Sequence, residues 1–350
     1  MFKAKTVFVL GAGASAEVGL PVGEELKGII AAKLDIRSDP NQGVNFGDER
    51  IKEAFWERDR LRGVVQNDIN PYIHAAWRLR DALPLAISID NLLDAHRDDE
   101  LAKVCGKLGI VSSILEAERK SNLSFPAGER QRLVSGLAQG TWFARFLKLL
   151  TEGTDKNNVD SIFDNISIVS FNYDRCLEHY LHEVLQIYYA LESNAITKIM
   201  ARLKIFHPYG SVGKLPWQEQ DQTLQVPYGA ERYNLLELSK QIKTYNESVD
   251  ENAEIEQIAH KIHEANIIVF LGFAFHEQNL NMLDPKANSM PKRVYATTSG
   301  ISDSNCTIIM SAIGDLLKSN QHMMPAASDF RKKFKCVDLL NEYSRSLTSP

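Results

Sequence analysis

The chain has 350 residues, of which 44% are hydrophobic and 24% charged, enough apolar side chains for one large elaborated domain or for two domains. Its formal net charge of −5 gives no overall attraction to nucleic acid or to an anionic membrane surface. The cysteines are far apart and form no C-x-x-C pair; they are Cys105, Cys176, Cys306 and Cys336. This spacing is typical of neither a disulfide framework nor a structural zinc site, and it predicts a cytoplasmic protein.

The N-terminus is not expected to be a signal peptide. Met1–Lys5 followed by VFVLGAGASA resembles one superficially, but a glycine interrupts the apolar run after five residues. The longest later apolar run, Ile267–Phe275, is too short to cross a bilayer. The sequence therefore predicts neither secretion nor a membrane span.

The first predicted element is a strand that runs directly into a glycine-rich turn. Thr6–Leu10 is a continuous apolar run typical of a strand buried on both faces, and the turn that follows it reads Gly-Ala-Gly-Ala-Ser over residues 11–15. Such a turn brings the backbone close to a ligand, and a helix that begins at Ser15 or Ala16 favours a phosphate. A dinucleotide pyrophosphate is one interpretation. The other is that Gly11 and Gly13 are needed only for packing.

An ordinary nicotinamide dehydrogenase is not expected. The Rossmann fingerprint places an acidic residue at the end of a second strand about 20 residues after the glycines. Residues 24–34 here have a helical pattern, and Arg37–Asp48 is a polar cluster typical of turns that ends the first α/β unit.

The middle of the chain predicts helices, and strands return after it. Helical patterns cover residues 49–62, 68–83, 89–97, 99–118 and 128–150. Strands are expected at Ser167–Phe171, Lys204–Phe206, Asn266–Phe270 and Arg293–Thr297, with helices at 174–191 and Cys306–Leu317. Residues 212–254 read as loops with one helix, and the tail after Leu340 as frayed. We therefore expect an α/β fold, a doubly wound, mostly parallel Rossmann-like sheet formed by residues 1–36 and 160–350, with a helical insertion at 37–159.

Polar or glycine-containing turns follow four of these strands, and in a doubly wound sheet such turns meet in one crevice. Asn172, directly after the second strand, offers an amide donor and acceptor that can orient a water, or it stabilises its own turn. His207 can share a proton near neutral pH, or it is a plain loop histidine. Asp174 contacts a ligand or caps the next helix. His276 is expected to cap a helix or cover the site rather than to take part in catalysis.

The ordered combination of these turns resembles the sirtuin-like domains of prokaryotic defence proteins. The shared pattern is G-A-G-x-S with a following G-L-P, then F-N-Y-D, then H-x-x-G, then G-F-x-F-H-x-x-N-L, and it covers about residues 5–35 and 165–300. The resemblance implies that the chain binds NAD and that Asn172 and His207 carry out hydrolysis. Ser88-Ile89-Asp90 is similar to an element beside the family's NAD pocket, or it is a helix cap.

The resemblance also implies roles for single residues. The glycine turn would hold the pyrophosphate, Asn172 would place a water, His207 would bond the ribose and act as a base, and Asp174 would bind the carboxamide. Thr297, Thr298 and Ser299 are candidates for contact with the adenosine ribose because they follow the fifth strand. The full set of expected NAD-binding residues is Gly11, Ala12, Gly13, Ser15, Asp90, Asp174, Gly210, Gly272, Phe273, Thr297 and Ser299.

Conventional sirtuin deacylases carry a repeated C-x-x-C pair that holds zinc, and this chain has none, so the resemblance favours NAD⁺ hydrolysis without a metal. The expected function is an NAD⁺ glycohydrolase that depletes NAD⁺ in phage-infected cells. A non-hydrolysing NAD⁺ or ADP-ribose sensing module and a zinc-free deacylase remain alternatives. Related short proteins imply control by self-association or by a HerA-like ATPase partner, with no direct binding to nucleic acid or membrane.

Overall fold

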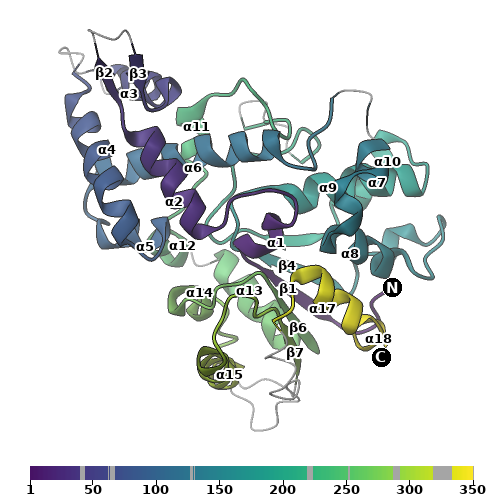
Figure 1. The fold of residues 1–350 in the computed structure, drawn as a ribbon. Coiled ribbons are helices and arrows are strands. Elements are labelled where there is room, and N and C mark those ends of the chain that lie inside the picture. The colour runs from purple at the N-terminus through teal and green to yellow at the C-terminus, as the bar shows by residue number, and fades with distance from the viewer. Residues whose placement is uncertain are drawn as a thin grey trace.

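A computed structural model describes residues 1–39, 44–61, 63, 68–126, 129, 131–218, 224–250, 253–286, 292–317 and 333–349. Its centre is a five-stranded parallel sheet in the order β5-β4-β1-β6-β7 (Figure 1). The strands are β1 (Thr6–Leu10), β4 (Ile166–Ser170), β5 (Lys204–Phe206), β6 (Ile267–Leu271) and β7 (Arg293–Ala296). Because β1 is central, the strand order reverses between β1 and β6. The expected doubly wound, Rossmann-like α/β fold is confirmed.

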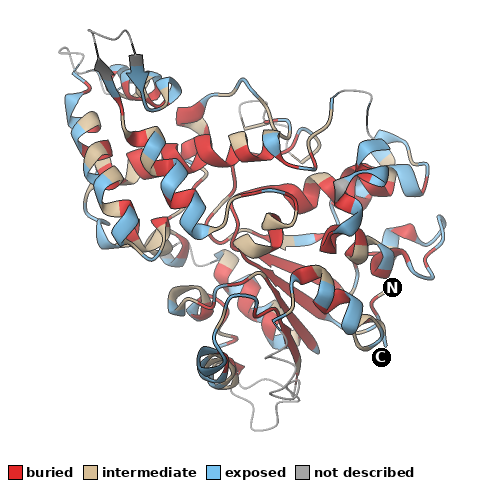
Figure 2. Ribbon diagram, in the orientation of Figure 1, coloured by how far each residue is buried: buried red, intermediate tan, exposed pale blue. Residues whose placement is uncertain are grey.

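The sheet is covered on both faces, which explains its continuous apolar strands (Figure 2). Thr6 of β1 pairs with Ile166 of β4 and Ile267 of β6, so alternate residues of neighbouring strands share a face. On one face, Val7 and Val9 belong to the core that also contains α13 (Ala253–Glu264) and α15 (Asp303–Leu317). On the other, Phe8 belongs to the core with α8 (Trp142–Thr151), α9 (Cys176–Tyr188) and α17 (Cys336–Glu342).

The remaining helices form a lobe at one end of the sheet and short covers elsewhere (Figure 1). The lobe contains α2 (Gly23–Leu34), α3 (Glu49–Leu61), α4 (Asn70–Ala82), α5 (Ile89–Ala95) and α6 (Glu100–Lys120). The short elements are α1 (Ala12–Ala16), α7 (Gln131–Ser135), α10 (Ser193–Met200), α11 (Leu235–Ser239), α12 (Tyr245–Asp250), α14 (Glu277–Asn281) and α18 (Ser344–Thr348), with 3-10 turns at Leu83–Leu85, Leu137–Gly140 and Val159–Ser161.

The helices of the expected insertion pack in two different places. In the lobe, α2 packs against α4 and α6, and Gly109 of α6 leaves room for Ile30 of α2. By contrast, α8 packs on the sheet, where the rings of Phe146 and Phe8 lie 5.1 Å apart. The lobe is therefore built around α6 and includes α2, a helix of the first α/β unit, while α8 completes the sheet's own core.

Four expectations about local structure were wrong. The helix expected to begin at Ser15 or Ala16 begins at Ala12 and ends at Ala16. The turn cluster at 37–48 contains a short antiparallel hairpin of β2 (Arg37–Asp39) and β3 (Val44–Phe46). The helix expected at 128–150 is divided into α7, a 3-10 turn and α8, because Gly136 has an extended backbone, in which a Cβ would lie 2.3 Å from the Arg132 carbonyl oxygen. The tail after Leu340 is not frayed, because α18 inserts a fully buried Leu347 into the core.

The loop region expected at 212–254 lies within the described residues except for 219–223 and 251–252, and it carries α11, α12 and the start of α13. No helix among the described residues is long and apolar enough to cross a membrane.

Candidate functional site

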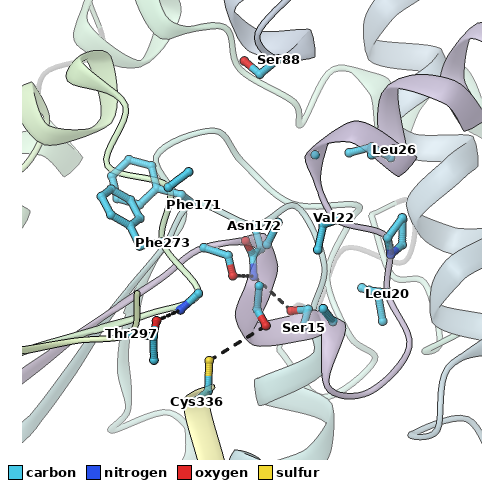
Figure 3. Close-up of a pocket in the computed structure, with 18 of the residues that line it drawn as sticks. Ser15, Leu20, Val22, Leu26, Ser88, Phe171, Asn172, Phe273, Thr297 and Cys336 are labelled. Carbon is cyan, nitrogen blue, oxygen red and sulfur yellow. Dashed lines mark hydrogen bonds between the residues drawn. The ribbon is translucent and has the colours of Figure 1, made fainter. Parts of the chain in front are cut away.

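A cavity of about 660 Å³ opens at the carboxyl ends of β1 and β6, where the strand order reverses (Figure 3). Open α/β sheets bind ligands at this position, and the volume lies in the usual range for small-molecule sites. Most of the expected site residues line it: Gly11, Ala12, Gly13, Ser15, Asp90, Asn172, Asp174, Gly272, Phe273, Thr297 and Ser299. His207 and Gly210 do not.

The glycines of the two turns pack against each other. A Cβ on Gly11 would lie 2.6 Å from the Gly272 carbonyl oxygen, and one on Gly13 would lie 2.8 Å from the Gly272 Cα. The Gly13 N–H donates to the Gly272 carbonyl oxygen at 3.0 Å. Gly272 itself has a φ of +58°, and a Cβ there would lie 2.1 Å from the Ala14 nitrogen. The packing interpretation of these glycines is thus sufficient to explain them.

Asn172 is buried at the end of β4, with its amide directed at the glycine turn (Figure 3). Its Nδ2 donates to the Gly11 carbonyl oxygen and to the Ser15 Oγ, both at 3.0 Å. These two bonds use both amide hydrogens and fix the orientation of the side chain. The Asn172 Oδ1 is therefore the atom of this amide that is suited to accept a hydrogen bond from a ligand or a water.

Asp174 lines the cavity and also bonds the first turn of a helix. Its Oδ1 accepts from the Cys176 N–H at 3.1 Å, in the first turn of α9. Burial raises the pKa of Asp174, while hydrogen bonds from Cys176 and Ser15 oppose that rise. Ser15 thus bonds both Asn172 and Asp174 and joins the glycine turn to the end of β4.

The Ser88-Ile89-Asp90 element also both caps a helix and lines the cavity. The Ser88 Oγ accepts from the Asn91 N–H at 3.1 Å at the start of α5. Asp90 accepts a hydrogen bond from the Tyr173 hydroxyl. Burial raises the pKa of Asp90, and the bond from Tyr173 acts in the opposite direction.

The residues after β7 form another wall of the cavity. The Thr297 Oγ1 accepts from the Gly272 N–H at 2.7 Å, which joins the turns after β6 and β7 (Figure 3). Thr297 is buried, whereas Ser299 is exposed at the rim. Of these two, Ser299 has the hydroxyl that is open to a ligand.

His207 lies behind Asn172 and outside the cavity lining, which corrects its expected place beside the ribose. Its Nε2 lies 2.8 Å from the Glu178 Oε1, and its Nδ1 lies 3.2 Å from the Asn172 carbonyl oxygen. Burial disfavours the imidazolium, but the Glu178 carboxylate outweighs this and raises the pKa of His207. The pKa of Glu178 is lowered because His207 outweighs the effect of burial. The two side chains therefore form a buried ion pair.

Gly210 also lies outside the lining. Its φ of +75° and its contact with the next loop explain the glycine, because a Cβ there would lie 1.8 Å from the Gln241 carbonyl oxygen. Its N–H donates to the His207 carbonyl oxygen at 2.8 Å. Gly210 thus shapes the turn that carries His207.

The sequence did not predict the C-terminal wall of the cavity, which Phe334, Lys335 and Cys336 form. Glu17 holds this wall. Its Oε1 accepts from the Val337 N–H at 3.0 Å, at the start of α17, and its Oε2 accepts from the Trp142 N–H at 2.7 Å, at the start of α8. A carboxylate at two helix N-termini is favoured by both helix dipoles.

The turn after β6 also contributes polar residues that the sequence had not singled out for binding. His276 and Asn279 both line the cavity, and burial lowers the pKa of His276. Their signal was their place in the strand-end motif G-F-x-F-H-x-x-N-L, which residues 272–280 carry.

The cysteines and the acidic residues give no sign of a metal centre in the part of the chain that the structure describes. All four cysteines are buried and none of them forms a disulfide, and no group of three or more potential metal ligands comes together there. Comparison with protein-family models matches no family, and comparison with curated proteins finds no relative. Any proposed function therefore rests on the sequence motifs, the fold and the cavity.

Proposed function

We propose that this chain is an NAD⁺ glycohydrolase. The observation that carries the proposal is the cavity at the reversal point of a Rossmann-like sheet, into which the glycine turn and the oriented amide of Asn172 both face. The cavity extends from Ser88, at the start of α5, past the glycine turn to Cys336, at the start of α17, which suits an elongated ligand such as a dinucleotide (Figure 3).

The two halves of the dinucleotide would lie on either side of the glycine turn. The pyrophosphate would lie against the backbone at Ala12, in the turn itself. The adenosine half would extend toward Ser299 and the C-terminal wall. The nicotinamide half would then lie beside Asn172 and Asp90, on the β4 side.

Hydrolysis breaks the bond between the ribose C1′ and the nicotinamide nitrogen, and neutral nicotinamide leaves with the electron pair. Water adds to C1′ and releases a proton, which gives ADP-ribose. Positive charge develops on the ribose, as in glycoside hydrolysis. The Asn172 Oδ1 would accept a hydrogen bond from the attacking water. His207 would act indirectly, by positioning Asn172 through its contact with the Asn172 backbone, rather than as a base on the substrate.

The placement of His207 favours a second candidate function. With its ring bonded to Glu178, the residue expected to act as the base is absent from the cavity lining among the described residues. A module that binds NAD⁺ or ADP-ribose without cleaving it, and that regulates a partner, would need no such base.

One experiment separates the two functions. The purified chain is incubated with NAD⁺ while nicotinamide and ADP-ribose are followed by chromatography, and NAD⁺ binding is measured by calorimetry. Release of both products in equal amounts supports the hydrolase. Binding without release supports the sensing module, and the absence of both refutes the dinucleotide site.

We further propose that the hydrolase acts as an effector of antiphage defence under the control of an assembly. The resemblance to sirtuin-like defence domains supports this, with a HerA-like ATPase or a second copy as the partner. Light scattering, together with NAD⁺ turnover with and without the neighbouring gene product, tests it. A monomer with full constitutive activity would refute control by assembly.

A further inference from the structure

We propose that Arg175 and Glu118 are positioning residues for the hydrolysis, and that they fix the backbone of the turn that carries Asn172. This rests on the proposed function, since it names what holds the amide that would place the attacking water. The turn lies between β4 and α9, and Glu118 lies in the last turn of α6, which belongs to the helical lobe.

Arg175 and Glu118 form an ion pair in the interior of the protein. Arg175 is 1% exposed and Glu118 is 0% exposed, and charged side chains are rarely buried to this extent unless they are paired. The Glu118 Oε1 accepts from the Arg175 backbone N–H at 3.0 Å and from its Nε at 3.1 Å, while the Glu118 Oε2 accepts from Nη2. One carboxylate therefore holds both the backbone and the guanidinium of the same residue, so this end of the turn is fixed to α6.

The same pair also holds the segment 226–229 on the other side of the turn. The Arg175 Nη1 donates to the Val226 carbonyl oxygen, and its Nη2 donates to the Pro227 carbonyl oxygen at 3.4 Å. The Gly229 N–H donates to the Glu118 Oε2 at 3.4 Å. A planar guanidinium has five donors in a fixed arrangement, and here it bonds a carboxylate and two backbone carbonyls at once. The turn is thus held between α6 and this segment.

Helix α6 is a firm support that also reaches the cavity. It is buried along much of its length (Figure 2), and Ile114, one helical turn before Glu118, lines the cavity. Burial raises the pKa of Asp174, and the Glu118 carboxylate adds to that rise, so the charge of Glu118 acts on a second residue of the turn that lines the cavity. The support and the site are therefore adjacent.

Asn172 is consequently placed by two different sets of bonds. Its side-chain amide bonds the glycine turn, whereas the backbone of its own turn is held three residues later, at Arg175. If the second set is lost, the turn can shift relative to the substrate, and a shift of about 1 Å in a catalytic group can lower a rate about a hundredfold. The glycine turn and the residues after β6 and β7 are joined by bonds of their own, so the affinity for NAD⁺ should change little.

The test measures kcat and KM for nicotinamide release, per folded protein, in variants of the pair. Arg175→Lys keeps the cation but not the planar arrangement of donors, and it should lower kcat by about tenfold to a hundredfold with little change in KM. Glu118→Gln keeps an oxygen for the Arg175 N–H, so it should lower kcat less than Glu118→Ala does. The double variant Glu118→Gln with Arg175→Met leaves no unpaired buried charge, so it should fold and still show the low kcat.

Lys33→Met is the matched control. Lys33 pairs with Glu116 of the same helix at 2.7 Å and with Asp48 at 2.9 Å, and all three side chains belong to the lobe and lie outside the cavity lining. This variant should lower the free energy of unfolding and leave kcat per folded protein unchanged, which separates positioning from a general loss of stability.

The outcomes are distinct. If Arg175→Lys and the double variant keep the unmodified kcat, if they raise KM alone, or if Lys33→Met lowers kcat as much, the positioning role is refuted while the hydrolase stands. If the unmodified chain releases no nicotinamide, the hydrolase itself fails, and the positioning role fails with it.

Discussion

Replacing Gly272 by alanine should destabilise the protein severely, through the contact between the two glycine turns. Its φ of +58° costs an L residue about 1–2 kcal/mol. The new Cβ would lie 2.1 Å from the Ala14 nitrogen and 2.3 Å from the Gly13 carbonyl carbon, and overpacking of this kind costs about 1–3 kcal/mol. Separating the turns also breaks the Gly13 to Gly272 hydrogen bond, worth about 1 kcal/mol. We expect a loss of about 3–6 kcal/mol in the free energy of unfolding.

Gly153→Ala is the matched control. Gly153 has a similar φ of +73°, but no atom lies within 4 Å of its Cβ position, so only the conformational cost of about 1–2 kcal/mol remains. Urea unfolding of both variants, followed by circular dichroism, measures the difference. Equal losses in the two variants would refute the close packing of the turns, and with it the explanation of the glycines at 11 and 13.

Three further predictions concern single side chains. Asn172→Ala should abolish nicotinamide release from NAD⁺ and keep a cooperative thermal transition; an unchanged rate would remove Asn172 from the chemistry. His207→Gln leaves Glu178 buried without its partner and should cost about 3–5 kcal/mol in urea unfolding. That loss should be greatest between pH 4.5 and 6.5. The stability that Glu178 contributes is complete above pH 4.5 and falls as the pH drops through its lowered pKa. The stability that His207 contributes is complete below pH 6.5 and falls as the pH rises through its raised pKa. A loss that does not depend on pH would contradict the ion pair. Glu17→Ala should lower the free energy of unfolding by about 1–2 kcal/mol, and it should expose the chain near Lys335 to trypsin more than Glu17→Gln does. Equal protection of the two variants from trypsin would contradict the link to α17.

The sequence predicted the sheet well because its strands carry strong local signals. β1 and β5 lie where the apolar runs placed them, and the other strands are within one residue of their expected limits. The β2–β3 hairpin was missed because Arg37–Asp39 has no alternating pattern. Leu347 was missed for a different reason, since only its contacts with distant residues distinguish a packed C-terminal helix from a frayed one.

Much of the lining of the cavity was predicted because parallel strands bring their following turns to one edge. Details that depend on long-range contacts could not be predicted. The direction of the His207 ring is set by Glu178 on the following helix, which no motif records. Glu17 bonds residues 125 and 320 positions away. The glycine motif is also ambiguous, because close approach to a ligand and close approach to another turn select the same residue.

The dependence of the cavity on Glu17 and α17 affects when the site first exists during synthesis. The glycine turn and Asn172 leave the ribosome before the wall at Phe334–Cys336, which follows them in the chain. A nascent chain lacks this wall until α17 has docked on Glu17. If the chain consumes NAD⁺, its complete site therefore forms only after α17 has been made and has docked.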